Sequence, residues 1–546
     1  MADPSPQQSV GGKDFDVPVL IIGGGPVGLA VAAELGWRGV RCQVVEQTDG
    51  AIAHPKTNGI NMRTLEICRR WGIAQRVHDE GFPKDYPHDH IYVTSLTGHL
   101  LARQKRPPMA EMKAPRGAIE TFQRCPQTTF DPMLKGVALS FATVDLRYHV
   151  RCEEVEQDAD GVTAELTDLQ SGTSSRIRAN YAVACQGANS PVRDALGFKM
   201  EGTAVLAYST NMLFRSAELL KLHDKGPGRS YIAIGPEGNW ASINSINGDD
   251  LWRLQVSGST DPKSWQEVDF DECVKRFVGR DFCYELISTL TWIRRQLVCN
   301  HYQLGRIFLA GDAVHQLTPA GSFGMNTGIG DAVDIVWKIA AMLNGWGGPR
   351  LLESYEPERR PIGKRNVDVA AARFKRYAPF KPGPAILEDT PAGDRVRTQV
   401  AKKLETTMLP FGEGFQVGYR YDDSPIIWPD GTPTPPLDGA TYNPTTRPGA
   451  RAPDAWIDED TRILDLYGKG FVLVRLGADA AEAAGFEAAA EDCGMPLEVV
   501  TMENPEIIDL YERKLVLVRP DGHVAWRGDD VPDDCRAVID RVRGAT

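Results

Sequence analysis

The sequence lacks the features of nucleic-acid-binding and membrane-spanning proteins. It carries 61 Lys and Arg against 73 Asp and Glu, a formal net charge of −12, whereas phosphate binding depends on clustered basic side chains. The uncharged stretch 17–33 is interrupted by two prolines and four glycines, which argues against a membrane span. Residues 1–15 have no basic segment followed by an apolar core, so we expect a disordered lead, not a signal peptide. We therefore expect a cytoplasmic protein with neither nucleic acid nor membrane as a partner.

Cysteine and histidine occur without the spacing that redox or metal chemistry requires. The ten cysteines are scattered and none belongs to a C-x-x-C pair, which predicts reduced, mostly buried thiols. The two histidines of the segment 88–90 have no second set of ligands nearby in the sequence. The sequence therefore predicts no metal site.

A glycine-rich turn separates two apolar stretches near the N-terminus. Residues 17–22 form a continuous apolar run of the kind buried in parallel sheets, and Gly23, Gly25 and Gly28 follow in the spacing G-x-G-x-x-G. The first glycine permits the sharp turn, the second lets a pyrophosphate approach the backbone, and the third allows the next helix to pack on the strand. The second strand ends at Glu46, where a carboxylate would bind ribose hydroxyls. An acid at this point favours NAD or FAD over NADP.

A second glycine-rich segment helps to decide between NAD and FAD. We expect a strand over 306–310, a turn at Asp312 and a helix over about 328–342. The backbone of residues 324–328 leaves unpaired N–H groups beside the start of that helix, which is a site for an electron-rich group. A carboxylate at a strand end can accept hydrogen bonds from a polyol, so the combination suits the ribityl chain and ring of FAD. His315 has no chemical step of its own and is interpreted as structural.

Taken together, these segments resemble the single-component flavoprotein aromatic hydroxylases, which are class A flavin monooxygenases with the p-hydroxybenzoate hydroxylase fold. Further segments that resemble this family are HPKTNGINMRTLEICRRWGI (54–73), QRCPQTTFDPML (123–134) and YAVACQGANSPVRDALG (181–197). The resemblance covers about residues 15–375. It implies an α/β fold with a Rossmann-type FAD-binding domain and an inserted antiparallel-sheet substrate domain.

The resemblance implies an FAD-dependent monooxygenase that hydroxylates a phenolic or related small aromatic substrate. Electrons would come from NADH or NADPH, which binds transiently because the sequence offers no second G-x-G-x-x-G turn. The inserted oxygen would come from O2 through a flavin C4a-hydroperoxide. Three alternatives stay open: epoxidation or Baeyer–Villiger-type oxygen insertion on a polycyclic substrate, a flavin dehydrogenase or reductase, and a non-catalytic flavoprotein.

The resemblance also assigns residues to the cofactor. Arg124 and Gln127 would lie along FAD, Asp312 would hold its ribityl and pyrophosphate region, and Pro319 would lie beside the reacting face of the flavin. The backbone from Gly324 to Thr327 would face the isoalloxazine ring, with Gly324, Met325 and Asn326 as the cofactor-binding residues. The positions that depart from the family pattern are Lys56, Asn58, Gln186 and Ser322. Gln186 replaces an aspartate near both FAD and the route of NAD(P)H, and Asn58 replaces an acid.

Residues 202–260 alternate in a strand-like way and predict an antiparallel sheet over the substrate cavity. Its polar and aromatic candidates are Tyr208, Asn211, Tyr231, Trp240, Asn244 and Arg253. Oxygen transfer from a flavin requires an electron-rich ring, so a base or hydrogen-bond acceptor is needed near a phenol. The candidates for that catalytic role are His54, Tyr208 and Tyr231.

A chain of 546 residues allows two or three domains. We place the FAD-binding domain at 16–200 and 300–375, the substrate-binding domain at 201–299, a helical segment and proline-rich connector at 376–455, and a last domain at 456–546. The order of strands and helices in the last domain resembles a thioredoxin-like domain, and LVRPDGHVAWRG resembles the tail of the phenol hydroxylase branch. Without a C-x-x-C pair this domain is expected to support the structure or a homodimer instead of redox chemistry.

Overall fold

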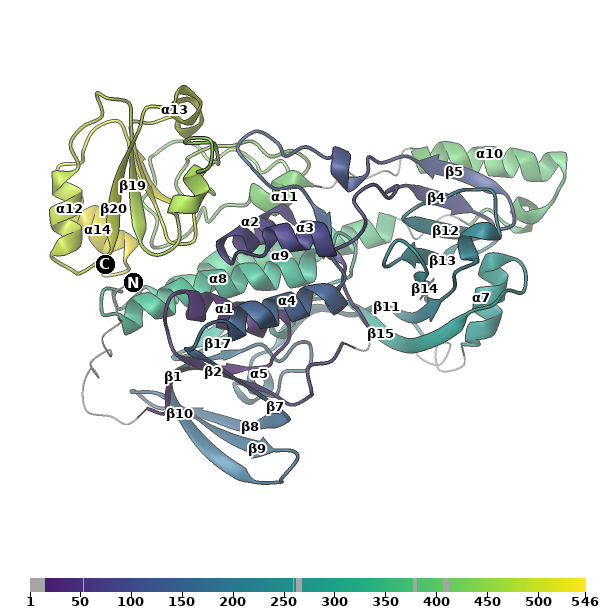
Figure 1. The fold of residues 1–546 in the computed structure, drawn as a ribbon, viewed down its shortest axis with the longest axis horizontal. Helices are drawn as coiled ribbons and strands as arrows, with labels where there is room; N and C mark the ends of the chain where they lie inside the picture. The colour runs from purple at the N-terminus through teal and green to yellow at the C-terminus, as the bar shows by residue number, and fades with distance from the viewer. Residues whose placement is uncertain (1–14, 53, 259, 262–267, 377–380, 406–411) are drawn as a thin grey trace.

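The chain folds around three β-sheets that are joined by two long helices. The computed structural model describes residues 15–52, 54–258, 260–261, 268–376, 381–405 and 412–546. In Figure 1 the first sheet lies at the bottom, the second at the right and the third in the C-terminal part at the upper left. The helices α8 (Phe323–Leu343) and α9 (Tyr355–Arg376) lie between them.

The first sheet is the Rossmann-type core. Its strand order is β16-β17-β10-β1-β2-β7, with β9 pairing with β10 and β8 with β9. The strands are β1 (Val17–Ile22), β2 (Cys42–Glu46), β7 (Val144–Tyr148), β8 (Val150–Gln157), β9 (Val162–Asp168), β10 (Ser174–Ala184), β16 (Gln303–Leu304) and β17 (Ile307–Leu309). Every residue of β1 except Pro18 is buried. The predicted apolar strand and the end of the second strand at Glu46 are therefore confirmed.

Several helices pack around this core. They are α1 (Pro26–Trp37), α2 (Met62–Arg70), α3 (Ala74–Glu80), α4 (Gln127–Leu139) and α5 (Pro191–Ala195). A small two-stranded sheet joins β3 (Gly59–Ile60) to β6 (Gln123–Arg124). α1 packs against α8, so the two helices that follow the two glycine-rich segments are neighbours.

The second sheet has the order β18-β15-β11-β14-β13-β12-β4-β5. Its strands are β4 (His90–Val93), β5 (Leu100–Gln104), β11 (Met200–Arg215), β12 (Ser230–Gly235), β13 (Gly238–Ser245), β14 (Leu251–Ser257), β15 (Glu285–Cys299) and β18 (His315–Gln316). The neighbours pair antiparallel except β12 and β4, which are parallel. β4 and β5 belong to this sheet although they lie outside the predicted substrate domain 201–299. The pairing of β4 with β12 joins segments that are far apart in sequence.

Two helices cover opposite parts of the second sheet. α7 (Phe270–Val278) packs through Phe277 on the face that buries Trp252 and Leu254. α10 (Pro391–Glu405) packs through Val400 against Ile232 near the β4–β5 edge. The helical segment predicted after residue 376 therefore covers part of the second sheet.

The third sheet forms the C-terminal domain, with the order β20-β19-β21-β22. Its elements are β19 (Phe471–Leu476), α12 (Ala484–Glu491), β20 (Leu497–Met502), α13 (Pro505–Tyr511), β21 (Leu515–Val518), β22 (Val524–Gly528) and α14 (Cys535–Val542). β19 and β20 are parallel, whereas β21 and β22 run antiparallel to their neighbours. This order of strands is that of a thioredoxin-like domain, as the sequence predicts.

The second glycine-rich segment differs from its prediction. α8 begins at Phe323 instead of Gly328, after Ser322 in the left-handed backbone region at φ 56°. Residues 324–327, expected as loop, form the first turns of the helix. Ser322 stands at the position where the family pattern has glycine, the residue that adopts a positive φ without strain.

Three observations concern membrane spans, metal ligands and cysteines in the described chain. Among the described residues no helix combines the length and apolar character of a membrane span, and no group of three His, Cys, Asp or Glu is placed to hold a metal ion. The cysteines are free thiols.

Candidate active site

The first glycine-rich turn is shaped by two glycines and left open at the third. A Cβ atom at Gly23, where φ is +109°, would lie 2.5 Å from the carbonyl oxygen of Cys185, and one at Gly28 would lie 1.9 Å from the carbonyl oxygen of Gly23. A Cβ atom at Gly25 would meet no protein atom within 4 Å among the described residues. Gly23 and Gly28 are therefore needed for packing, whereas Gly25 borders open space at the start of α1.

Glu46 lies beside this turn at the end of β2. Its Oε2 accepts a hydrogen bond from the backbone N–H of Gly24 at 2.7 Å, and its Oε1 accepts from the N–H and hydroxyl of Thr48. These bonds fix the carboxylate at the edge of the turn, and Oε2 retains a lone pair for a further donor. The position is the one expected for a ribose-binding acid.

The second glycine-rich segment meets the first at one point. A Cβ atom at Gly328 of α8 would lie 2.5 Å from Cγ2 of Val27 in α1 and 3.0 Å from Cα of Gly311. The starts of both helices and the turn before Asp312 are thus in contact. A Cβ atom at Gly324 would lie 3.8 Å from Oδ1 of Asp312, so the carboxylate faces the first turn of α8.

Asp312 lines a recess. Its side chain is exposed to open space, yet the surrounding protein desolvates the carboxyl and raises its pKa, while His315 and Lys56 oppose the rise. A carboxyl on a flat surface would be both exposed and well solvated. A carboxyl that is exposed and yet desolvated faces an interior space. We therefore place Asp312 on the wall of a cleft.

These features fit FAD. Within the described residues no side chain caps the start of α1 or α8, so the first N–H groups of both helices are available to an anion or an electron-rich ring. Gly25 leaves room beside one helix start, and Asp312 supplies acceptors beside the other. Bound FAD would be held by these groups, with its pyrophosphate at α1.

Met325 and Asn326 direct their side chains into the protein, and their predicted backbone contact with a flavin stays a prediction. Met325 packs in the hydrophobic core of the first sheet. The side chain of Asn326 accepts from the N–H of Asn61 at 3.0 Å and donates to the carbonyl of Gly59 at 2.9 Å. This amide ties α8 to the segment that starts α2, which sets the position of the helix start.

Arg124 and Gln127 hold the segment 54–59. Gln127 accepts from the backbone N–H of Lys56 at 2.8 Å and of Thr57 at 3.2 Å, and Nη1 of Arg124 donates to Oδ1 of Asn58 at 2.9 Å. Asn58 is therefore a hydrogen-bond acceptor for an arginine where the family pattern has an acid. The predicted contacts of Arg124 and Gln127 with FAD stay predictions.

Gln186 caps a helix. Its Oε1 accepts from the hydroxyl of Ser190 at 3.0 Å and from the N–H of Val192 at 3.2 Å, at the start of α5. The amide oxygen thus performs the capping that an aspartate would perform. Arg193, in the same helix, donates to the carbonyl of Ala313, next to Asp312.

His315 has the structural role predicted for it. The ring is fully buried, and its Nε2 lies 2.8 Å from Oδ2 of Asp331. Pro319, in contrast, is exposed in the loop before α8, and its predicted place beside the flavin stays a prediction.

A polar row of side chains crosses the face of the second sheet that looks toward segment 54–59. Register pairs His90 with Ser230, Ser230 with Asn244, and Asn244 with Arg253. Directly opposed residues point to the same face. The row continues to Ser288, whose hydroxyl lies 3.0 Å from Nδ1 of His54. The sequence offered one signal for it, the alternation of polar residues along β14.

Two of the predicted catalytic tyrosines lie away from this row. Tyr231 alternates with Ser230, is fully buried, and donates its hydroxyl to the carbonyl of Gly226 at 2.6 Å. Tyr208 alternates with Ser209 and so points to the opposite face. The strand alternation turns both side chains from the face that holds Arg253, and their predicted catalytic role stays a prediction.

Arg253 and Arg294 bring positive charge to the polar face. Arg253 donates from Nη1 to the carbonyl oxygen of Pro55 at 3.1 Å, and its buried Nε has no partner among the described residues. Arg294 is 4 % exposed and donates from Nε to the hydroxyl of Ser209 at 2.7 Å. Burial lowers the pKa of each guanidinium to about 10, and at Arg294 the charge of Arg253 adds to the shift.

His54 is neutral in this surrounding. Burial, followed by the charges of Arg253 and Lys56, lowers the pKa of its imidazole to about 4. Its Nε2 is buried and has no hydrogen-bond partner among the described residues. Of the three predicted catalytic candidates, His54 alone faces the polar row.

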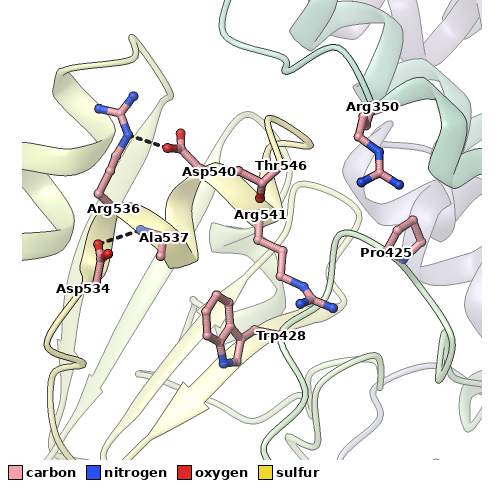
Figure 2. A pocket seen from close by; sticks show the side chains of 9 residues that line it. All are labelled: Arg350, Pro425, Trp428, Asp534, Arg536, Ala537, Asp540, Arg541 and Thr546. Atoms are coloured by element: carbon pink, nitrogen blue, oxygen red, sulfur yellow. Dashed lines mark hydrogen bonds and ion pairs between the residues drawn. The ribbon is translucent and has the colours of Figure 1, made fainter.

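A surface hollow of about 600 Å³ lies elsewhere, between the connector and α14 (Figure 2). Its charged side chains have partners: Arg536 pairs with Asp540 at 2.8 Å, and Arg541 donates to the carbonyl of Ile427. It includes none of the predicted site residues, so we assign it no part in the chemistry.

Comparisons with known proteins show the family of this chain. Residues 16–370 match the family model of the FAD binding domain, and residues 445–546 match that of the aromatic-ring hydroxylase C-terminal domain. Tetracenomycin B2 monooxygenase-dioxygenase of Streptomyces olivaceus is 31% identical over 97% of this chain and 98% of its own. The chain therefore belongs to the FAD-dependent aromatic-ring hydroxylases, flavoprotein monooxygenases for which NAD(P)H is the typical reductant.

Solved structures share the whole fold. RebC, in a chromopyrrolic acid-soaked structure with bound 7-carboxy-K252c, is 39% identical with a TM-score of 0.88 over 98% of this chain and 100% of its own. Aklavinone-11 hydroxylase, in a ternary complex with FAD and aklavinone, is 27% identical with a TM-score of 0.81 over 97% of this chain and 100% of its own. Both cover the C-terminal domain as well as the two larger sheets.

Proposed function

We propose that the protein uses NAD(P)H and O2 to hydroxylate a polycyclic aromatic compound that carries an anionic group, with a carboxylate as the simplest choice. The observation that carries the proposal is the pair of guanidinium groups of Arg253, which is half-buried with a buried Nε, and Arg294, which is buried, on the polar face opposite His54. Among the described residues, neither one forms an ion pair with an acid.

Burying a guanidinium without a counter-ion costs free energy. Burial lowers the pKa of both groups, which is the signature of that cost. An anionic substrate group would offset it with charge-assisted hydrogen bonds, which are about twice as strong as neutral ones. Guanidinium groups without a counter-ion lower the stability of the fold and favour the binding of an anion.

The charge around the row strengthens this argument. Burial lowers the pKa of Arg124 well below its usual value, and the nearby charges of Arg229, Arg253 and Arg106 lower it further. The whole chain carries a net charge of −12, so this cluster of positive charge stands out against the rest of the protein. A cleft of this sign attracts anions from solution.

The width of the row favours several fused rings over one. His90 and Arg253 are separated by three strand spacings, which span about 14 Å. A single phenol ring would span only part of this row. The bound compound in the RebC structure is named as a carboxy derivative, which supports the same class of ligand here.

His54 would accept a hydrogen bond from a hydroxyl or N–H group on the substrate ring. Its Nε2 has no hydrogen-bond partner among the described residues, and burial with the nearby charge of Arg253 lowers its pKa, which keeps it uncharged at neutral pH. Asn58 is already engaged by Arg124, so it offers no base for a simple phenol. This division of roles favours the polycyclic alternative over the small phenolic substrate.

FAD, when bound, would take a hydride from NAD(P)H and supply an oxygen atom derived from O2 to the ring. The residues of this chain would hold the cofactor at α1 and α8, orient the substrate through Arg253, and keep the ring substituent hydrogen-bonded to His54. The segment 54–59 would separate the ring from solvent.

The test uses the FAD-loaded protein with NADH or NADPH and three compound sets: fused-ring aromatic acids, their methyl esters, and simple phenols. NAD(P)H oxidation, O2 uptake and hydroxylated product are measured together. We expect the acids to stimulate all three in equal amounts. Stimulation by simple phenols alone would contradict the substrate class, and NAD(P)H oxidation without O2 uptake would favour a flavin dehydrogenase. Bound FAD with no turnover of any compound would favour a non-catalytic flavoprotein.

A further inference from the structure

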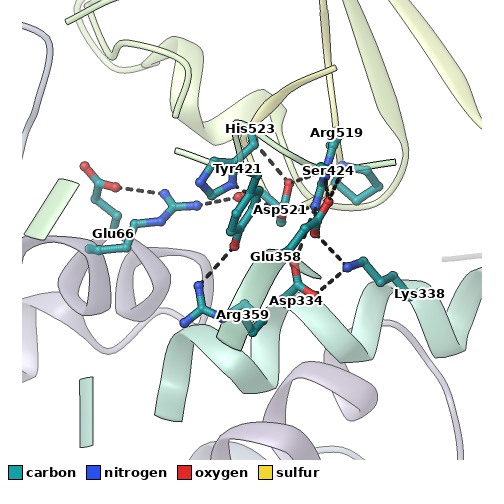
Figure 3. Close-up of polar contacts among 12 residues, drawn as sticks. Glu66, Asp334, Lys338, Glu358, Arg359, Tyr421, Ser424, Arg519, Asp521 and His523 are labelled. Carbon is teal, nitrogen blue, oxygen red and sulfur yellow. Dashed lines mark hydrogen bonds and ion pairs between the residues drawn. The ribbon is translucent and has the colours of Figure 1, made fainter. Parts of the chain in front are cut away.

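A buried network of charged groups joins α8 and α9 to the C-terminal domain (Figure 3). We call it the interdomain network, and its members are Asp331, Asp334, Lys338, Glu358, Arg359, Tyr421, Arg519 and Asp521. Each is at most 3 % exposed. None belongs to the polar row or to the predicted substrate contacts.

Arg359 is the member that contacts the first half of α8. Its Nε donates to Oδ1 of Asp331 at 2.9 Å, and its Nη2 donates to the carbonyl of Thr327 at 3.0 Å. A Cβ atom at Gly330 would lie 2.6 Å from Nη2 of Arg359. The glycine therefore makes room for the guanidinium to lie directly on the helix.

Asp331 carries this contact to the turn before Asp312. Its Oδ2 accepts from the N–H of Gly311 at 3.1 Å and lies 2.8 Å from Nε2 of His315. Burial opposes ionisation of Asp331, but Arg359 and His315 outweigh it and lower the pKa of the carboxyl. The ionised carboxylate thus fixes the backbone beside the predicted ribityl-binding residue.

Tyr421 and Arg519 carry the network to the C-terminal domain. The third bond of Arg359 runs from Nη1 to the hydroxyl of Tyr421 at 3.1 Å. The ring of Tyr421 lies 4.3 Å from that of His523, and the guanidinium of Arg519 lies 5.2 Å above it. Arg519 in turn donates to both oxygens of Glu358, the residue before Arg359.

We propose that the C-terminal domain takes part in FAD binding through this network, with Tyr421 and Arg359 as positioning residues for the start of α8 and the Asp312 turn. The contacts run without a break from Arg519 through Tyr421, Arg359 and Asp331 to Gly311. Tyr421 does not touch the predicted FAD site, and Arg359 reaches it at the carbonyl of Thr327, the last residue of the predicted flavin-facing backbone. The proposal is independent of which substrate the protein accepts.

A purely stabilising role would be a poor explanation of the network. Replacing buried ion pairs by apolar side chains is often neutral or stabilising, so ion pairs at this depth are better explained by the geometry they impose. Here that geometry is the placement of the Thr327 carbonyl and the Gly311 N–H, both next to groups predicted to hold the cofactor.

The test compares Tyr421→Phe with Tyr511→Phe. Tyr511 is also fully buried in the C-terminal part, and its hydroxyl donates to the carbonyl of Pro453 at 2.9 Å. Both variants remove one buried hydroxyl, but only the first removes a partner of Arg359. The Kd for FAD is measured by titrating apoprotein and following flavin fluorescence, together with the visible circular dichroism of bound flavin and the Tm of each apoprotein.

We expect Tyr421→Phe to raise the Kd for FAD by about tenfold and to change the visible circular dichroism. Tyr511→Phe should lower the Tm by a similar amount and leave the Kd within about twofold of the parent value. Equal changes of Kd in both variants, or a lower Tm with an unchanged Kd in Tyr421→Phe, would overturn the proposal.

A second variant covers the case in which Tyr421→Phe does not fold. Arg359→Lys keeps the positive charge beside Asp331 but cannot reach Thr327 and Tyr421 at the same time. The same rise of the Kd for FAD is expected. An apoprotein of this variant that folds and binds FAD with the parent Kd and spectrum would equally overturn the proposal.

Discussion

Arg253 donates a hydrogen bond from Nη1 to the carbonyl oxygen of Pro55 at 3.1 Å, which joins the second sheet to segment 54–59. The same segment is fixed from the other side by Gln127, which accepts from the N–H groups of Lys56 and Thr57. A ligand that recruits Arg253 would therefore act on a segment that also contacts the predicted FAD-binding helix α4. Substrate binding and the cofactor environment are thus linked by hydrogen bonds that can be altered one at a time.

Two glycines of the first turn should respond differently to alanine. Gly25 has an extended backbone at φ −73° and open space around its Cα, so Gly25→Ala should fold with an unchanged apoprotein Tm. The added methyl group would occupy the space expected for the pyrophosphate, and we expect the Kd for FAD to rise by about tenfold or more.

Gly28→Ala is the matched control for that prediction. Its Cβ atom would lie 1.9 Å from the carbonyl oxygen of Gly23, so we expect a loss of about 3 kcal/mol or more in the free energy of unfolding, with or without FAD. Urea unfolding of both apoproteins and FAD titration measure the two effects. Equal loss of stability in the two variants would contradict the assignment of Gly25 to the ligand.

The buried acid Asp131 should make stability depend on pH. It lies in α4 behind Gln127, and burial raises its pKa to about 7, from an ordinary value of 3.8. Between these two values the unfolded chain releases the proton while the folded chain keeps it, so this group lowers the stability of the fold as the pH rises from about 4 to 7.

Asp131→Asn should remove that dependence. We expect the variant to be more stable than the parent by about 2 kcal/mol at pH 8 and nearly equal to it at pH 4. Urea unfolding at several pH values provides the measurement, with the exposed Asp145→Asn as control. A stability difference that stays constant from pH 4 to pH 8 would show that Asp131 ionises normally in the fold.

Gln186 has two suggested roles, capping α5 and contacting the cofactor, and substitutions can separate them. If its main role is to cap α5 through Ser190 and Val192, Gln186→Ala should lower the free energy of unfolding by about 1 kcal/mol and leave the Kd for FAD within about threefold. Gln186→Asp, the family residue, should retain most of the cap. A tenfold weaker binding of FAD or NAD(P)H with unchanged stability would instead assign Gln186 to the cofactor.

The local parts of the fold could be predicted from the sequence. The strand from Val17 to Ile22, the turn at Gly23 and the end of β2 at Glu46 depend on neighbouring residues, whose spacing carries the signal. The start of α8 was misplaced because glycines at 324, 328 and 330 disfavour a helix in isolation. In the fold the lack of a side chain at Gly328 and Gly330 makes room for Val27 and Arg359, which pack directly against the helix.

The substrate face could not be predicted in the same way. Which face Tyr208 or Tyr231 occupies depends on the register of β11 and β12 with their neighbours, and a shift of one residue would exchange the faces. The row from His90 to Arg253 combines strands from separate parts of the chain. The pairing of these strands brings the polar side chains of the row together.

The most direct test of the account measures the binding of one fused-ring aromatic acid and its methyl ester to the parent protein, to Arg253→Gln and to Arg276→Gln. Arg276 belongs to the same domain but is paired with Glu237 and lies over Trp240, so it serves as the matched control. Dissociation constants are read from the perturbation of the bound flavin spectrum. We predict that the parent and Arg276→Gln prefer the acid by about tenfold or more, and that Arg253→Gln binds acid and ester with nearly equal affinity. An acid preference of the same size in all three proteins would contradict the assignment of Arg253 to an anionic substrate group.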